Sequence, residues 1–279
     1  MLRPPVLNHL VTSGWHRRHM SWQPHMVALD IDGTLVDHEG HLPDPIREAV
    51  DRIKAADIPV VLATGRAWAD TEPIFEALDL PPGPAVTSNG AVVIDFPPYR
   101  LRKQVTFDPG PAIQKVLAKH PHMRVAVEDP RGGYRLNELF PDGDLTGEMR
   151  LQTVEELCAE PVTRVIIRDP NSSSEDFKKI ARGLGMRGVS YFIGWSAWLD
   201  IAPVGVNKAT GLKEVCAEFG VKRKHVLALG DGRNDTHMLK WAGRGVALGD
   251  APDEVKECAD HVTGRFADGG TVEELSRWF

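Results

Sequence analysis

The sequence predicts an α/β fold: a doubly wound core with a parallel sheet, interrupted by an inserted α+β segment. Short apolar runs at 26–29, 58–63 and 226–229 suit strands that are buried on both faces, as in a parallel sheet. Apolar residues at helical spacing follow these runs, so strands and helices alternate. In 91–195 the two patterns mix without strict alternation. We therefore expect a core formed by 25–90 and 196–279 around an insertion at 91–195.

The first core elements form a strand–helix–strand unit. After the strand at 26–29, Asp44 suits the N-cap of a helix and Pro45 its first position. Apolar residues recur at helical spacing from 46 to 53, and the run at 58–63 is the second strand. Such a crossover joins parallel strands and is almost always right-handed. The polar residues that follow the two strands are therefore expected at one edge of the sheet.

The remaining elements follow from the same patterns. In the core, helices are expected at 67–80, 209–219, 236–242, 253–259 and 272–278, and extended segments at 85–87, 198–202, 245–248 and 261–263. In the insertion, strands are expected at 92–95, 104–107, 124–128, 162–167 and 189–193, and helices at 111–120 and 175–182. Gly220 is a natural stop for the helix that begins near 209.

Composition excludes several classes of protein. The chain has 279 residues, 42% hydrophobic residues and a net charge of −6, which gives no reason to expect a nucleic-acid partner. No run approaches the roughly 18 apolar residues of a membrane span. Three cysteines without a CxxC pair fit a reducing cytoplasm. Residues 1–24 lack the apolar core of a signal peptide and are expected to form a disordered tail. Monomer and homodimer are both open.

Two aspartates follow the first strand, one residue apart. Asp30 and Asp32 would repel each other unless a cation or a shared proton compensates. Mg²⁺ takes one or two carboxylates together with substrate phosphate, and a carboxylate can also act as a nucleophile. The alternative is a solvated Asp-x-Asp-Gly turn. Polar clusters after other strands favour a site at this edge of the sheet: 64–66, 88–90 and 230–235.

Four motifs in order resemble the haloacid dehalogenase-like superfamily of phosphatases, and within it the Cof-type branch with a large C2-type cap. They are Asp30-Ile-Asp32-Gly-Thr-Leu, Ala63-Thr64-Gly-Arg66, Val206-Asn-Lys208 and Gly230-Asp231-Gly-Arg-Asn234-Asp235. The resemblance covers the chain from about residue 25 onward. It implies a Rossmann-like core, with the insertion at 91–195 as the cap that selects the substrate.

The resemblance also implies roles for individual residues. Asp30 would attack phosphorus to form an aspartyl-phosphate, and Asp32 would act as the acid and base. Thr64 would hydrogen-bond the phosphate, and Lys208 would supply positive charge beside it. The implied Mg²⁺ ligands are Asp30, Asp32 through its backbone carbonyl, Asp231 and Asp235, the last as a ligand or through water or Lys208. The residues expected to contact substrate or phosphate are Gly65, Arg66, Asn89, Gly90 and Asn234.

The sequence leaves more than one role open for each of two arginines. Arg66 either reaches the substrate or pairs with a carboxylate of the core. Arg233 lies beside the proposed metal loop, where relatives often have an acidic or small residue. It pairs with a carboxylate of the cap, binds an anionic substrate, or is a surface arginine.

The sequence thus predicts a Mg²⁺-dependent phosphatase that acts on a small phosphorylated metabolite. A sugar phosphate is favoured, with FMN or pyridoxal phosphate next, because Cof-type relatives span that range. The alternative from another class is a regulatory protein that binds a phosphorylated metabolite on the same scaffold with little turnover. The presence of both Asp30 and Asp32 argues against it, since binding alone has no need for a nucleophile and an acid.

Overall fold

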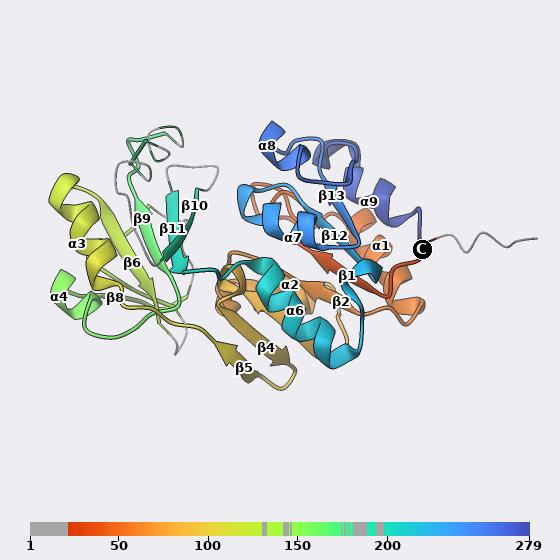
Figure 1. The fold of residues 1–279 in the computed structure, drawn as a ribbon, viewed down its shortest axis with the longest axis horizontal. Helices are drawn as coiled ribbons and strands as arrows, with labels where there is room; N and C mark the ends of the chain where they lie inside the picture. Colours follow the sequence, from red (N-terminus) through yellow and green to blue (C-terminus); the bar gives the residue numbers. More distant parts are fainter. Residues whose placement is uncertain are drawn as a thin grey trace, which may run out of the picture.

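The computed structural model describes residues 22–129, 133–141, 145, 147–173, 175, 177, 179–180, 189–193 and 198–279. Of the tail expected over 1–24 only 22–24 are described, and of the helix expected over 175–182 only 175, 177, 179 and 180 are described, all four helical. The described chain forms two lobes, each built around its own sheet (Figure 1). None of the described helices combines the length and the apolar composition needed to cross a membrane.

The first lobe contains a parallel sheet in the order β14-β13-β12-β1-β2. Its strands are β14 (His261–Val262), β13 (Arg244–Ala247), β12 (Val226–Gly230), β1 (Met26–Leu29) and β2 (Val60–Leu62). A parallel bridge between Ala63 and Val86 continues the sheet to β3 (Gly83–Thr87). The carboxyl ends of β1 and β12 are neighbours in this order, so the loops that follow them meet at one edge.

Helices cover both faces of this sheet because successive residues of a buried strand point to opposite sides. Val27 and Leu29 belong to the apolar cluster that includes α1 (Asp44–Ala55), α2 (Trp68–Ala77) and α9 (Gly270–Leu275). Met26 and Ala28 belong to the cluster that includes α6 (Lys208–Phe219), α7 (Thr236–Trp241) and α8 (Asp253–Lys256). The predicted doubly wound α/β core is therefore confirmed. Short 3₁₀ turns connect other elements: η1 (Ser88–Gly90), η2 (Arg223–His225), η3 (Arg233–Asp235) and η4 (Phe266–Asp268).

The second lobe contains a six-stranded sheet in the order β10-β11-β9-β6-β7-β8. The strands are β10 (Val189–Ile193), β11 (Trp198–Pro203), β9 (Val165–Arg168), β6 (Arg124–Glu128), β7 (Tyr134–Leu136) and β8 (Met149–Leu151). Neighbours are antiparallel except β7 and β8. One face packs against α3 (Gly110–Lys119) and α4 (Val154–Leu157). The other face carries Tyr134 and Ile166, which cluster with Ala67 of the first lobe.

Strand pairing differs from the expected domain ranges at both ends of the insertion. β4 (Val92–Phe96) and β5 (Arg100–Gln104, in place of the strand expected at 104–107) lie in the range expected for the insertion but form an antiparallel sheet with β3, and Val93 packs into the first lobe. β11 was expected in the core but pairs with β9 and β10 of the second sheet. The apolar pattern of a strand shows that it is buried but does not identify its partner strands.

Candidate active site

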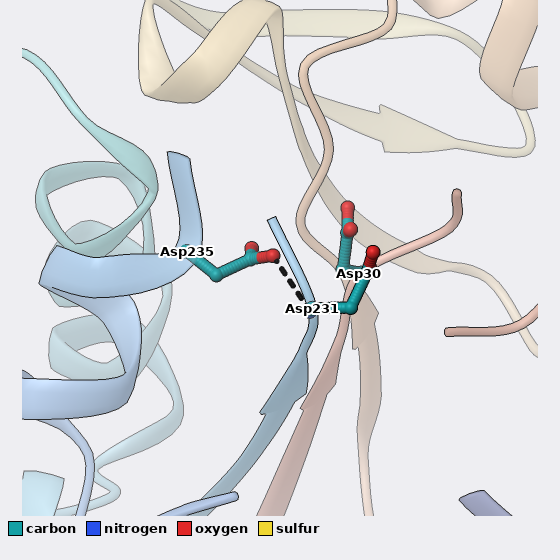
Figure 2. A group of neighbouring side chains, drawn as sticks. All are labelled: Asp30, Asp231 and Asp235. Carbon is teal, nitrogen blue, oxygen red and sulfur yellow. Dashed lines mark hydrogen bonds between the residues drawn. The ribbon is translucent and has the colours of Figure 1, made fainter. Parts of the chain in front are cut away.

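Three buried carboxylates gather where β1 and β12 end. Asp30 follows β1, Asp231 follows β12, and Asp235 closes the turn η3 (Figure 2). One oxygen from each carboxylate lies within 4.8 Å of the others. This juxtaposition joins segments about 200 residues apart in the chain, as expected for neighbouring strands of a parallel sheet.

Lys208 places an ammonium between two of these carboxylates. It is the first residue of α6, whose N-cap Asn207 forms a capping box with Thr210. The Lys208 Nζ donates to Asp30 Oδ1 and to Asp235 Oδ1, both at 2.6 Å, and the side chain is 0% exposed. Burial alone would lower the pKa of Lys208, but Asp235 and Asp30 raise it above its ordinary value. The lysine is therefore a permanent cation of the site.

Asp235 organises the loop after β12. Its Oδ2 accepts from the backbone N–H of Asp231 at 3.1 Å, the bond drawn in Figure 2, and from that of Gly232 at 2.9 Å. Both of its oxygens thus accept hydrogen bonds, since Oδ1 binds Lys208. Of the roles expected for Asp235, this geometry favours action through Lys208 and the loop over direct coordination of a metal.

The loop after β1 packs directly against Asp231. The Thr34 hydroxyl donates to Asp231 Oδ1 at 3.1 Å. Gly33 has φ +74°, a conformation that L side chains rarely adopt, and a Cβ there would overlap the Asp231 carboxylate. A glycine is therefore required where the two loops meet.

The charges at this site are unbalanced. Burial, with repulsion from Asp235 next, raises the pKa of Asp231 to about 7. Burial also raises the pKa of Asp30, with Asp235 adding to the rise and Lys208 opposing it. One ammonium thus faces three carboxylates, and oxygen ligands of this kind are those that Mg²⁺ prefers. Within the described chain, Asp30 and Asp231 make their side-chain hydrogen bonds through Oδ1, which leaves an oxygen of each for a cation. The residues fit a divalent metal.

The expected phosphate-binding residues form a neighbouring cluster. The Asn234 side chain donates to Asn89 Oδ1 at 3.0 Å, and a Cβ added at Gly65 would lie 3.2 Å from that oxygen. Ser88, Asn89 and Gly90 all have positive φ, at 50°, 54° and 93°. A Cβ at Gly90 would overlap the backbone carbonyl of Asn207, so this turn lies against the start of α6. The structure brings these segments together, and such strained turns occur at functional sites.

Asp32 and Arg66 form a separate pair at the edge of this site. Arg66 Nε donates to Asp32 Oδ2 at 3.0 Å and Nη2 to Oδ1 at 2.6 Å. Of the two interpretations of Arg66, the structure thus shows a carboxylate partner in the core. Thr64 is fully buried, and its Oγ1 accepts from the Arg66 backbone N–H at 3.1 Å. The Thr64 hydroxyl hydrogen therefore remains for another acceptor.

Sequence reasoning missed the side chains that the second lobe brings to this edge. Ser88 donates to both oxygens of Glu128, at 2.8 and 2.7 Å, and Asn89 Nδ2 donates to Asp200 Oδ2 at 3.3 Å. Arg164 donates to the carbonyl of Gly65. Charged residues within apolar strand patterns, Arg164 in 162–167 and Asp200 in 198–202, are the signal that could have identified them.

Arg233 lies beside the acidic loop and pairs with Glu254. Glu254 belongs to α8 of the first lobe, so the carboxylate that Arg233 meets is not in the cap. Among the described residues, Arg233 therefore pairs within the first lobe and not with the insertion, where the cap was expected.

Comparison with known proteins agrees with the motifs. A family model described as haloacid dehalogenase-like hydrolase matches residues 27–275. The chain is 25% identical over 275 residues to the 5-amino-6-(5-phospho-D-ribitylamino)uracil phosphatase YitU of Bacillus subtilis, covering 93% of this chain and 99% of the relative. It is 28% identical over 260 residues to the pyridoxal phosphate phosphatase YbhA of Escherichia coli, covering 86% of this chain and 93% of the relative.

Solved structures show the same architecture. BT1666 from Bacteroides thetaiotaomicron, described among phosphatases of the haloalkanoate superfamily, superposes with a TM-score of 0.75 at 27% identity, over 95% of this chain and 98% of that chain. The subclass IIB sugar phosphatase BT4131 superposes with a TM-score of 0.77 at 22% identity, over 90% of this chain and 98% of that chain. The second likeness bears on the fold alone.

Proposed function

The chain belongs to the haloacid dehalogenase-like hydrolase family and is one of its phosphatases, and we propose that it hydrolyses a small phosphorylated metabolite through an aspartyl-phosphate on Asp30. The observation that carries the proposal is the buried Lys208 ammonium, which binds Asp30 and Asp235 at 2.6 Å each. It fixes one Asp30 oxygen and supplies positive charge where a phosphate would lie. Phosphoryl transfer depends mainly on such positioning and charge neutralisation.

The residues divide the reaction between them. An Asp30 oxygen attacks phosphorus, the bond from phosphorus to the leaving oxygen breaks, and the leaving oxygen takes a proton from Asp32. Water then attacks the aspartyl-phosphate and gives a proton to Asp32, which frees Asp30 and inorganic phosphate. We assign to Thr64 and Asn234 the hydrogen bonds to the phosphoryl oxygens. Thr64 Oγ1 accepts from the Arg66 backbone, which leaves its hydrogen to donate, and Asn234 Nδ2 has a second hydrogen besides the one it donates to Asn89.

We assign the divalent site to Asp30 and Asp231, with the backbone carbonyl of Asp32 as the further ligand implied by the family resemblance. The fit rests on their buried, clustered carboxylates and on the raised pKa of Asp231. When bound, Mg²⁺ would neutralise charge on the phosphoryl oxygens. Asp235 would not bind the metal itself but would position Lys208 and the loop by accepting hydrogen bonds from the Lys208 ammonium and from the backbone N–H groups.

A sugar or polyol phosphate is the favoured substrate class, and FMN or pyridoxal phosphate is the second. The named relatives act on a phosphorylated ribityl compound and on pyridoxal phosphate. Glu128, Arg164 and Asp200 of the second lobe touch the polar turns around the site, and we propose that this lobe is the cap. Such groups suit hydroxyls better than a flat aromatic ring. The three cysteines are free, which suits the cytoplasmic location that the sequence predicts.

Hydrolysis of 4-nitrophenyl phosphate tests the function. Wild type should release phosphate with Mg²⁺ and lose activity in EDTA, whereas Asp30→Asn should be inactive under both conditions because the amide is no nucleophile. A panel of phosphorylated metabolites ranked by kcat/KM then identifies the substrate. Tight binding of a panel member without turnover would instead support the regulatory alternative. Equal activity of wild type and Asp30→Asn would refute the assigned nucleophile.

A further inference from the structure

Arg66 binds both oxygens of the Asp32 carboxylate, which a residue that only contacts substrate would not need to do. The Arg66 fork contacts both Asp32 oxygens, at 3.0 and 2.6 Å, and its third nitrogen Nη1 donates to the Asp70 carbonyl at 3.1 Å. The Asp32 side chain is 56% exposed, and within the described chain Arg66 is the one side chain that hydrogen-bonds it. An exposed carboxylate without such a partner rotates freely.

We propose that Arg66 is a positioning residue that orients the Asp32 carboxyl toward the leaving oxygen of the substrate. This inference rests on the proposed phosphatase function. A guanidinium that binds both oxygens fixes the plane of a carboxylate, which a lysine ammonium cannot do. Positioning carries weight because a displacement of about 1 Å of a reacting group can cost about 10²-fold in rate.

Residues of the second lobe form hydrogen bonds with the chain before and after Arg66. Arg164 of that lobe donates to the carbonyl of Gly65, the residue before Arg66. Tyr134 on β7 donates its hydroxyl to Asp70 Oδ2 at 2.8 Å, and the Asp70 carbonyl accepts from Arg66. Tyr134 is buried, and burial raises the pKa of its phenol, so it remains a donor. These contacts between the lobes thereby fix the conformation of the backbone around Arg66.

From this role we expect that the effect of replacing Arg66 on kcat/KM depends on the leaving group. The parameter kcat/KM covers the steps up to phosphoryl transfer, in which the bond to Asp30 forms and the bond to the leaving oxygen breaks. A 4-nitrophenolate ion is weakly basic and leaves without a proton. A phenolate ion is more basic and gains more from the Asp32 proton. A residue that orients Asp32 should therefore matter more for phenyl phosphate, whereas one that binds the phosphoryl group should matter equally for both.

The test measures kcat/KM for both esters in wild type, Arg66→Ala and Arg66→Lys. For both variants we expect a loss of at most about threefold on 4-nitrophenyl phosphate and of about tenfold or more on phenyl phosphate, a fraction of what a positioned acid contributes. Equal losses on the two esters, or none, would overturn the inference while leaving the phosphatase function intact. A wild type that hydrolyses neither ester would instead contradict the function.

Two further variants separate positioning from stability. Arg244→Ala removes another two-point pair, with Glu274 at 2.6 and 3.0 Å, at the amino end of β13. It should lower Tm without changing the ratio of the two kcat/KM values, and a changed ratio would count against the inference. Tyr134→Phe should shift the ratio in the direction of Arg66→Ala but add nothing to it in the double variant. Additive shifts would show that Tyr134 does not act through Arg66.

Discussion

Replacing Lys208 with methionine tests the electrostatic balance of the site. Methionine keeps much of the volume of the side chain but removes the ammonium that binds Asp30 and Asp235. The two carboxylates then face each other and Asp231 without a cation. We expect lower stability in metal-free buffer and a fall in kcat/KM of about 10²-fold or more, the usual effect of losing a donor to a charged transition state.

The size of the stability loss follows from the contacts. Lys208 makes two charge-assisted bonds of 2.6 Å and is 0% exposed, so solvent screens neither. Such bonds contribute about 1.5–3 kcal/mol each, and removing one partner of a buried ion pair costs about 3–5 kcal/mol. We expect a loss of about 3–5 kcal/mol at neutral pH. For a chain of this size that corresponds to a fall in Tm of roughly 6–20 °C.

Calorimetric unfolding in EDTA measures this loss, and Lys103→Met is the matched control. Lys103 pairs with Glu214 at the same 2.6 Å, but the two side chains are 38% and 55% exposed. Its replacement should cost no more than about 1 kcal/mol, as for other surface pairs. The difference between the two variants isolates the effect of burial.

A double variant gives the outcome that would refute the reasoning. Asp235→Asn removes one of the charges that Lys208 compensates, while the amide oxygen can still accept from the loop N–H groups. Lys208→Met with Asp235→Asn should therefore lose at least about 1 kcal/mol less than the two single losses together. Strictly additive losses, or a Lys208→Met loss as small as that of Lys103→Met, would refute the charge-balance account.

Three further predictions concern the metal, a glycine and pH. Mg²⁺ at 100 times its Kd should stabilise wild type by about 2.7 kcal/mol, and Asp231→Asn should lose most of the accompanying rise in Tm. An undiminished rise would contradict the assigned ligand. Gly33→Ala should cost about 2–4 kcal/mol and most activity, because it adds overlap with Asp231 to a positive φ. Gly40→Ala, with φ +81° and open space around it, should cost only about 1–2 kcal/mol and keep activity. Because burial raises the pKa of Glu128, although Arg164 opposes the rise, wild type should lose stability relative to Glu128→Gln as pH rises above about 4. Tm values of both proteins from pH 4 to 8 measure this trend, and an opposite slope would show that the carboxylate form is favoured.

Much of the first lobe and of the central site could be predicted from local patterns. Buried parallel strands are short apolar runs, and their carboxyl ends must meet at one edge of the sheet. That rule put Asp30 and Asp231 at one edge, the family resemblance paired them as metal ligands, and the structure brings their carboxylate oxygens within 4.8 Å. The end of α6 at Gly220, which has a left-handed conformation, could likewise be predicted because glycine adopts positive φ at little cost.

Local sequence patterns could not predict which strands pair with each other or which groups the long polar side chains contact. The mostly apolar pattern of β11 does not show that it joins the second sheet rather than the core, although Asp200 within it is a local sign of a different environment. The choice of Arg66 for Asp32 depended on where two loops 34 residues apart come to lie. The two roles left open for Arg66 had equal local support, and only the structure shows that it has a carboxylate partner in the core.

The sequence by itself determined the chemistry available at one edge of a parallel sheet: the carboxylates, the lysine and the hydroxyl, each at the end of an apolar run. Only the tertiary structure decided how that chemistry is held. It committed both oxygens of Asp235 to Lys208 and the loop, and it brought Glu128, Arg164 and Asp200 from the second lobe to the same edge. The physical reason is that strand periodicity is a local property, whereas a hydrogen bond between distant segments depends on how whole sheets pack.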